Sequence, residues 1–380
     1  MDELIPAFEA WRVMRFGDRE YVDAVVAPAH RSPSPGLASA LARWPGSWYW
    51  TAPDRSGLVL VRTVGAQRRE RWLFHAVLFL LTLLCALGAG AALAGAWFPP
   101  FGWSVYGPLA AALSGGVQFI RDALGGEWRQ LLPGLPFAAS LLGILLVHEL
   151  GHYFAARRYH IDTSPPFFLP VPPTLSPIGS LGAFIRLRSP VLDRRQLLDV
   201  GAAGPLAGFV VAIGVLIWGY TTSEPMALGP DTTGEFVTFA GRQIQLGSSL
   251  LTLGLREVFF PDAGAIFLSP PAFAGWVGAF VTALNLLPLS QLDGGHVLYA
   301  MFGRRQTAIG GCALVALFIL GFSAPSWWVW GVLALVVGGG RWSHPSVVAP
   351  EREVPRRRRW IGWACVAVFV LTFVPVPFGS

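Results

Sequence analysis

The chain has 380 residues, of which 53% are hydrophobic and only 13% are charged, whereas soluble domains are about 25% charged. This deficit of charge argues against a water-soluble protein, and the abundance of apolar residues excludes an intrinsically disordered chain. All 28 basic residues are arginine, the net charge is +6, and the arginines cluster at the ends of apolar segments. We interpret them as signals of membrane topology that contact lipid headgroups, and not as a nucleic-acid-binding surface.

The first 71 residues form the only long polar stretch of the chain. Apolar residues around Val22–Val26 and Leu58–Val61 predict short strands, and the segment Pro6–Phe16 is predicted to be a helix. We therefore expect residues 1–71 to form a small α+β cytosolic domain.

Seven apolar stretches of roughly 15–27 residues follow, each close to the ~20 residues that a helix needs to cross a bilayer. They lie at 72–98, 135–158, 197–220, 272–291, 307–323, 326–340 and 360–376. These stretches predict an all-α polytopic membrane protein of about seven transmembrane helices. We divide it into a first helix with an outside loop (72–134), a central region (135–300) and C-terminal transmembrane helices (301–380).

Arginine clusters predict the orientation of these stretches. Arg157 and Arg158 follow the second stretch, and Arg194 and Arg195 precede the third, so all of them lie on one side of the membrane if every stretch crosses it. The positive-inside rule then makes the N-terminus cytoplasmic. Arginine without lysine, together with much Ala, Gly and Pro, is typical of a GC-rich bacterial genome. We expect a multi-pass protein of the bacterial inner (cytoplasmic) membrane.

The connection 159–196 differs from an ordinary loop. It contains six prolines followed by the alternating run SLGAFIRLRSP. Proline breaks helices, and the alternation of apolar and polar residues favours strands. We expect a strand pair or a re-entrant loop, which at membrane depth requires protein or water to satisfy its backbone.

The second apolar stretch contains the run LLVHELGH, which places His148, Glu149 and His152 where a bilayer penalises polar groups. Residues four apart on a helix share one face, so the two imidazoles can bind one metal ion while Glu149 takes a proton from bound water. The alternative is a chance polar triplet, with odds on the order of one in a few hundred for a chain of this composition.

A catalytic zinc site needs a third protein ligand. Asp162, Asp193 and Asp199 flank the proline-rich connection, whereas Asp293 follows the fourth stretch in NLLPLSQLDGGH. Pro288 cannot donate a backbone hydrogen bond, and the glycines after Asp293 free the chain, so this helix end can open and turn the carboxylate inward. The alternative is an ordinary helix end with an exposed aspartate.

His296, three residues beyond Asp293, is a rival third ligand. A histidine that faces the surface is the simpler interpretation of that position.

HELGH in one stretch and NLLPLSQLDGG in a later one resemble the site-2 protease family of intramembrane zinc metalloproteases (peptidase family M50). GSLGAFIRLRSP at 179–190 is similar to the membrane-associated β-hairpin of that family, and AGPLAG at 203–208 is similar to its next span. The resemblance covers roughly 135–300. The segment that ends in NLLPLSQLDGGH is most similar to the branch with chloroplast and cyanobacterial members.

The resemblance implies a role for each matching residue. His148, His152 and Asp293 bind one zinc ion per chain, and Glu149 is the general base and acid. Asn285 helps to hold substrate or stabilise the oxyanion, although an amide that packs helices together is the alternative. Three residues of the hairpin, Gly179, Ser180 and Gly182, belong to a strand that would pair with an unwound substrate, unless the hairpin is purely structural.

The expected function is hydrolysis of peptide bonds within or near the transmembrane segments of single-span membrane-protein substrates. An alternative is a catalytically inactive membrane scaffold that binds client helices. A third hypothesis is a metal transporter. It is less favoured, because a transporter would be expected to carry more carboxylates along a path through the membrane. No signal for an oligomeric state is present in the sequence.

Overall fold

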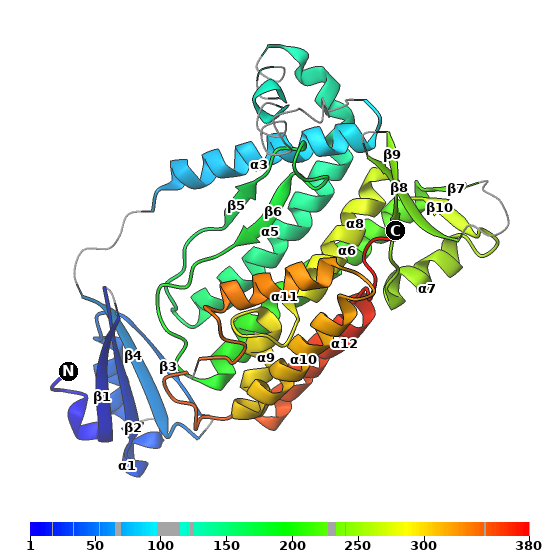
Figure 1. Ribbon diagram of the computed structural model, residues 1–380. Coiled ribbons are helices and arrows are strands. Elements are labelled where there is room, and N and C mark those ends of the chain that lie inside the picture. The colour runs from blue at the N-terminus through cyan, green and yellow to red at the C-terminus, as the bar shows by residue number, and fades with distance from the viewer. Residues whose placement is uncertain are drawn as a thin grey trace. The chain divides into compact units, whose positions relative to one another are not determined.

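The computed structural model describes the chain except residues 17, 33, 53, 65–69, 97–114, 120, 122–124, 227–232, 240, 346 and 380. Its elements are drawn in Figure 1. The chain divides into two compact units. The first comprises Met1–Arg71, Ala155–Ser164 and Arg186–Val191, and the second comprises Trp72–Phe154, Pro165–Ile185 and Leu192–Ser380.

The first unit is built on an antiparallel sheet with strand order β1-β2-β4-β3. Its elements are η1 (Ile5–Ala7), β1 (Phe8–Phe16), β2 (Arg19–Val26), α1 (Pro28–Arg31), α2 (Pro35–Ala42), β3 (Ser47–Trp50) and β4 (Gly57–Thr63). Val22, Leu58 and Leu60 on the sheet form a buried cluster with Leu37 and Leu41 of α2. The strands predicted around residues 22–26 and 58–61 are confirmed.

The helix predicted at Pro6–Phe16 is wrong, because Phe8–Phe16 forms strand β1. Trp11 pairs with Ala24, and Val13 pairs with Val22 across the sheet. Pairing with β2 outweighs the helical propensity of the Glu, Ala, Arg and Met residues in this run.

The rest of the chain contains the long helices α3 (Trp72–Leu93), α5 (Leu135–Arg158) and α6 (Arg194–Thr221). The shorter elements are η2 (Glu127–Gly134), β5 (Phe167–Pro170), β6 (Ser180–Phe184), β7 (Glu224–Met226), β8 (Gly234–Phe239), β9 (Arg242–Leu246), α7 (Leu250–Phe259), β10 (Ala265–Phe267), α8 (Pro270–Asn285), α9 (Asp293–Phe302), η3 (Gly303–Arg305), α10 (Gln306–Leu320), α11 (Ser326–Val337), η4 (Arg356–Arg358) and α12 (Arg359–Thr372).

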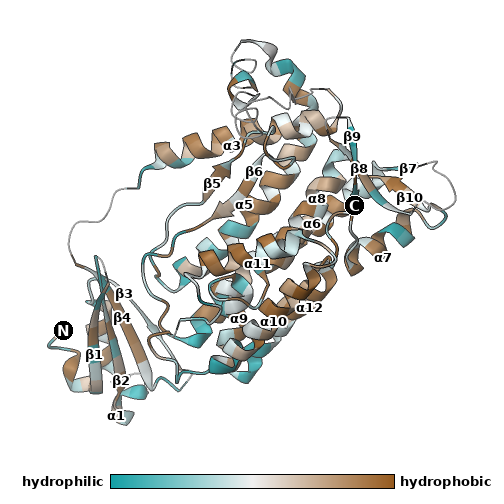
Figure 2. Cartoon of the chain, viewed as in Figure 1, coloured by the Kyte–Doolittle hydropathy of each residue, from teal (hydrophilic) through white to brown (hydrophobic). Residues whose placement is uncertain are grey.

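Three helical segments of the described chain are long and apolar enough to cross a membrane: Trp72–Leu93, Trp128–Arg158 and Arg194–Thr221. The shortest has 22 residues, or about 33 Å at the α-helical rise of ~1.5 Å per residue, against a hydrocarbon thickness of ~30 Å. Apolar residues cover most of α3 and much of α5 and α6 in Figure 2. We therefore treat the chain as an integral membrane protein.

The prediction of an all-α fold with seven transmembrane helices is wrong. The last four predicted stretches do form helices, but α8, α10, α11 and α12 have only 16, 15, 12 and 14 residues. At ~1.5 Å per residue they extend about 18–24 Å, which is shorter than the hydrocarbon core. A count of apolar residues along the sequence does not show where each helix ends.

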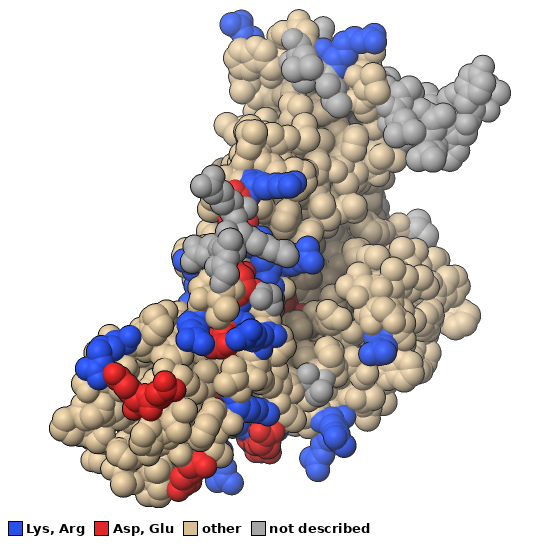
Figure 3. All heavy atoms as spheres, turned by 90° about the vertical axis from the view of Figure 1, so that its left-hand side faces the viewer, with Lys and Arg blue, Asp and Glu red and all other residues tan. Residues whose placement is uncertain are grey.

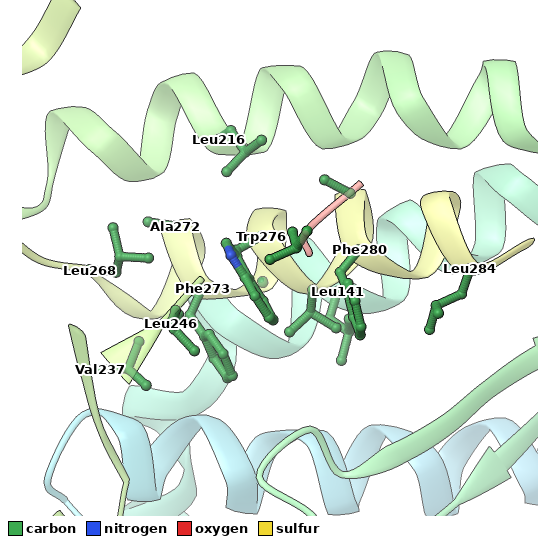
Figure 4. Close-up of a cluster of buried hydrophobic side chains, with 14 of the residues drawn as sticks. Leu141, Leu216, Val237, Leu246, Leu268, Ala272, Phe273, Trp276, Phe280 and Leu284 are labelled. Carbon is green, nitrogen blue, oxygen red and sulfur yellow. The ribbon is translucent and has the colours of Figure 1, made fainter. Parts of the chain in front are cut away.

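Burial within the protein gives a second reason for this error. Thirteen of the sixteen residues of α8 are buried. Phe273, Trp276 and Phe280 stack in series along α8, and Figure 4 shows them beside Leu141 of α5 and Leu216 of α6. This helix is apolar because it lies inside a packed core, a role that composition alone does not distinguish from a membrane span.

Two sheets in this part of the chain also exclude an all-α fold. One has four strands in the order β7-β10-β8-β9, and the other is the antiparallel pair β5-β6. The strand pair expected within 159–196 is therefore present, although its second strand covers only Ser180–Phe184 of the predicted 179–190. Of the outside loop predicted after the first span, residues 99–114, 120 and 122–124 lie outside the described residues.

Charged side chains form a minority of the face shown in Figure 3. Residues other than Lys, Arg, Asp and Glu form most of the face shown in Figure 3. This surface agrees with the 13% of charged residues in the sequence.

Candidate metal centre

Two helices bring together three side chains that could hold a metal ion. His148 and His152 lie one turn apart on α5, and Asp293 is the first residue of α9. The Nε2 atoms of both histidines lie 3.3 Å from Oδ2 of Asp293, and the two Nε2 atoms are 3.1 Å apart. The two histidines are at most 7% exposed. Such a close group of ligand atoms, with both histidines buried and Asp293 partly buried, fits a single metal ion.

The orientation of His152 is fixed from α6. Its Nδ1 lies 2.7 Å from the carbonyl oxygen of Val200. A carbonyl only accepts hydrogen bonds, so Nδ1 carries the proton and Nε2 presents a free lone pair toward Asp293. Hydrogen bonds of this kind set the tautomer and direction of metal-binding histidines.

Glycines on α6 make room for the histidines. A Cβ atom on Gly204 would lie 2.1 Å from Nε2 of His152, and one on Gly208 would lie 3.0 Å from Cβ of His148. A third glycine on this face, Gly201, packs in the same way against His296, at 2.8 Å. Small residues on α6 therefore allow close helix packing next to the site.

The chain folds back sharply before Asp293. Helix α8 ends at Asn285, and a Cβ atom on Gly294 would meet the carbonyl oxygen of Leu286 at 1.9 Å. A Cβ atom on Gly295 would meet the carbonyl oxygen of Ser290 at 2.3 Å. Only glycine allows this close approach, which turns the first residue of α9 toward α5.

Glu149 is buried beside the two histidines, at 5% exposure. Its carboxylate interacts electrostatically with His148, His152 and Asp293, and it accepts a hydrogen bond from the backbone N–H of Ile185. Ile185 directly follows β6, so the end of the two-stranded sheet holds the proposed base. In this position a carboxylate can exchange a proton with a water molecule at the ligand cluster.

Asn285 also reaches the cluster, since its side-chain nitrogen lies 3.4 Å from Nε2 of His148. The three other predicted residues stand at β6, outside the ligand group. Gly179 packs against the backbone of Cys85 on α3, and the Ser180 hydroxyl donates to the carbonyl oxygen of Leu169 and accepts from the N–H of Gly182.

The rival carboxylates have other partners. Asp162 forms an ion pair with Arg19, at 3.8 Å, within the first unit. Asp193 caps the N-terminus of α6 by accepting from the N–H of Gln196, and Asp199 forms an ion pair with Arg358. Within the described residues, the metal-binding group contains none of them.

His296 does not belong to that group either. It is half-buried, and its Nδ1 lies 2.6 Å from Nε2 of His344. The interpretation of His296 as a histidine that simply faces the surface therefore does not hold.

Two contacts of this site were missed by the sequence analysis, the Val200 carbonyl and the Ile185 N–H. Both are backbone groups, which every residue type except proline provides, so the amino-acid sequence does not indicate these contacts.

Two imidazoles and one carboxylate match the donors of catalytic zinc sites, which use three protein ligands and keep a position open. The ligand atoms all lie within 4.8 Å of one another, and the second nitrogen of His152 is already engaged. Together with the adjacent glutamate, this arrangement is typical of His-Glu-x-x-His metal-dependent hydrolases.

Comparison with known proteins agrees with this class. Residues 136–320 match the model of peptidase family M50. This range contains the three ligand residues and Glu149. The chain is 31% identical over 246 residues to "Probable zinc metalloprotease EGY1, chloroplastic" of Arabidopsis thaliana. It is 30% identical over 253 residues to "Probable zinc metalloprotease EGY2, chloroplastic" of the same plant. Residues 136–320 of the chain thus resemble peptidase family M50, as the motifs predict.

These alignments include 64% and 65% of this chain but only 43% and 42% of the relatives. The chain thus spans less than half the length of the curated relatives it matches. No solved structure matches it.

Proposed function

We propose that this protein is an intramembrane zinc metalloprotease in which His148, His152 and Asp293 hold one zinc ion. The observation that carries the proposal is the convergence of the three ligand atoms within 4.8 Å, two of them on α5, which belongs to a segment long and apolar enough to span a membrane. The relatives are named as probable zinc metalloproteases, which supports zinc as the metal.

The chemistry follows from the positions of the side chains. Zinc, when bound, would acidify a water molecule to a pKa near ~7 and polarise the substrate carbonyl. Glu149 takes the proton of the attacking water and passes it to the leaving amine. Asn285, beside His148, is placed to hold the substrate or to donate to the developing oxyanion.

The proposed substrates are single-span membrane proteins cut within or near their transmembrane segments. An intact helix hides its carbonyls in hydrogen bonds, so the substrate must unwind. The β6 strand is a candidate for pairing with the unwound segment through Gly179, Ser180 and Gly182. Leu181 on this strand is 75% exposed, and the strand leads directly to Ile185 and Glu149.

We further propose a bacterial cytoplasmic membrane with the N-terminus in the cytoplasm. Arg71 precedes α3, Arg157 and Arg158 end α5, and Arg194 and Arg195 begin α6. With these three helices crossing the membrane in turn, all five arginines fall on one side, which the positive-inside rule makes cytoplasmic.

Cleavage by the purified full chain in vesicles tests the proposal. We expect the wild type to cut a single-span substrate that contains Asn-Pro faster than one with a poly-Leu span. Glu149→Gln should lower the rate by about 10²–10⁴-fold, the usual contribution of a general base, and should keep its zinc. The exposed Glu257→Gln is the matched control. Binding of the substrate without cleavage by the zinc-loaded wild type would favour an inactive scaffold instead.

A further inference from the structure

The turn between α8 and α9 leads directly into Asp293. Hydrogen bonds from residues outside the turn hold it in place. Leu292, which precedes α9, makes no side-chain capping bond. Within the turn, Leu289 N–H bonds to Leu287 and Leu292 N–H bonds to Leu289. Two backbone groups, the carbonyl of Pro288 and the N–H of Ser290, bond instead to other parts of the chain.

Gln306, the first residue of α10, is the side chain that makes these connections. It is fully buried, at 0% exposure. Its Nε2 donates to the Pro288 carbonyl at 2.9 Å and to the Trp342 carbonyl at 3.2 Å. The Trp342 carbonyl in turn accepts from the N–H of Ser290 at 2.9 Å. One amide therefore ties the turn to the segment Arg341–His344, which we call the bracing segment.

The bracing segment reaches α9 by a second route. The Oε1 atom of Gln306 accepts from the backbone N–H of His344 at 2.9 Å. The imidazole of His344 lies 2.6 Å from that of His296 and stacks on Tyr299, both on α9. Since His296 packs against Gly201 of α6, this route fixes the first turn of α9 against the helix whose Val200 carbonyl orients His152.

Gly310 on α10 allows the turn, Gln306 and the bracing segment to meet at close distance. A Cβ atom there would lie 2.8 Å from the Pro288 carbonyl oxygen, 3.0 Å from Nε2 of Gln306 and 3.1 Å from the Trp342 carbonyl oxygen. A Cβ atom on the next residue, Gly311, would make only an ordinary contact, 3.4 Å from the indole nitrogen of Trp342. Space is therefore restricted on the side of α10 that faces the turn.

We propose that Gln306 is a positioning residue for the metal centre: through the Pro288 carbonyl and the bracing segment it sets the place of Asp293 opposite His148 and His152. It is not one of the three side chains that would hold the metal. Its amide both donates and accepts, which neither a carboxylate nor an apolar side chain of similar size can do. The proposal rests on the zinc site proposed above.

Zinc affinity of the full chain in detergent, measured by competition with a chelator, tests this role with a readout other than cleavage. We expect Gly310→Ala, which leaves Gln306 in place but crowds the junction, to bind zinc about 10-fold or more weakly, as for other residues that support metal ligands. Gly311→Ala, the same change one residue away on the same helix, should bind zinc as the wild type does.

Gln306→Glu provides the second variant. It retains the size and the acceptor for His344, but it loses the donor to Pro288 and Trp342, so we expect a similar loss of affinity. Affinities within twofold of the wild type in both Gly310→Ala and Gln306→Glu would overturn the proposal. Equal losses in Gly310→Ala and Gly311→Ala, or unfolding of Gly310→Ala in saturating zinc, would also overturn it by revealing a general role in folding. A wild type that binds no zinc would refute the proposed metal centre itself.

Discussion

Gly204 and His152 show how closely the metal centre depends on single atoms. The imidazole is fixed by the Val200 carbonyl at 2.7 Å, and the absence of a side chain at Gly204 gives its Nε2 atom room. Because the ring is held on one side, it cannot move away from a new methyl group without losing that hydrogen bond. Close packing of α5 and α6 is therefore part of the metal site.

Gly204→Ala should consequently weaken zinc binding by about 10–100-fold, the range typical of changes around metal ligands. Gly214→Ala on the same helix is the control, since a Cβ atom there meets nothing within 4 Å. Zinc titration and thermal unfolding of both variants check this expectation. Unchanged zinc affinity in Gly204→Ala would mean that the imidazole can be displaced freely.

The four-stranded sheet β7-β10-β8-β9 contains a buried carboxyl group. Glu235 on β8 is fully buried, and the Tyr220 hydroxyl donates to its Oε1 at 2.5 Å. Among the described residues, its Oε2 has no hydrogen-bond partner. Burial raises the pKa of Glu235 from 4.5 to about 7, although the Tyr220 hydrogen bond and the nearby Arg256 act in the opposite direction.

This sheet should therefore lose stability as the pH rises. With its pKa raised in the folded state, Glu235 binds more protons there than in the unfolded chain between pH 4.5 and about 7. The contribution of Glu235 to the free energy of unfolding is full below pH 4.5 and is lost by neutral pH, a change of about 3 kcal/mol. Thermal unfolding at pH 5 and pH 8 should show the decline in the wild type and in the exposed Glu224→Gln, but not in Glu235→Gln. An equal decline in all three would contradict this assignment.

Sequence patterns predicted long elements better than short ones. The helices that hold the histidines and glycines were found because long apolar runs of membrane helices leave little ambiguity. Helix α8 and strand β1 were misread because their state depends on burial and on pairing with distant residues, which a local pattern does not contain. Periodicity alone does not separate a buried helix from a membrane span.

Across the whole molecule, the metal-binding motif was the most predictable part of the site. His148, Glu149 and His152 come from one helical turn, so spacing alone places them together. Asp293 lies 141 residues after His152. Its position near the histidines depends on a turn in the chain, which the two glycines after Asp293 indicated. The supporting contacts of Val200, Ile185 and Gln306 were not predictable, because two are backbone groups and the third acts across separate segments.

The most direct test of this account is the amount of zinc bound per polypeptide in purified wild type, Asp293→Ala and Asp162→Ala. We predict about one zinc ion in the wild type and in Asp162→Ala, because one set of three ligands holds one ion, and a large loss in Asp293→Ala. A folded wild type without zinc would contradict the metalloprotease assignment. Full retention of zinc in Asp293→Ala would contradict its place among the ligands.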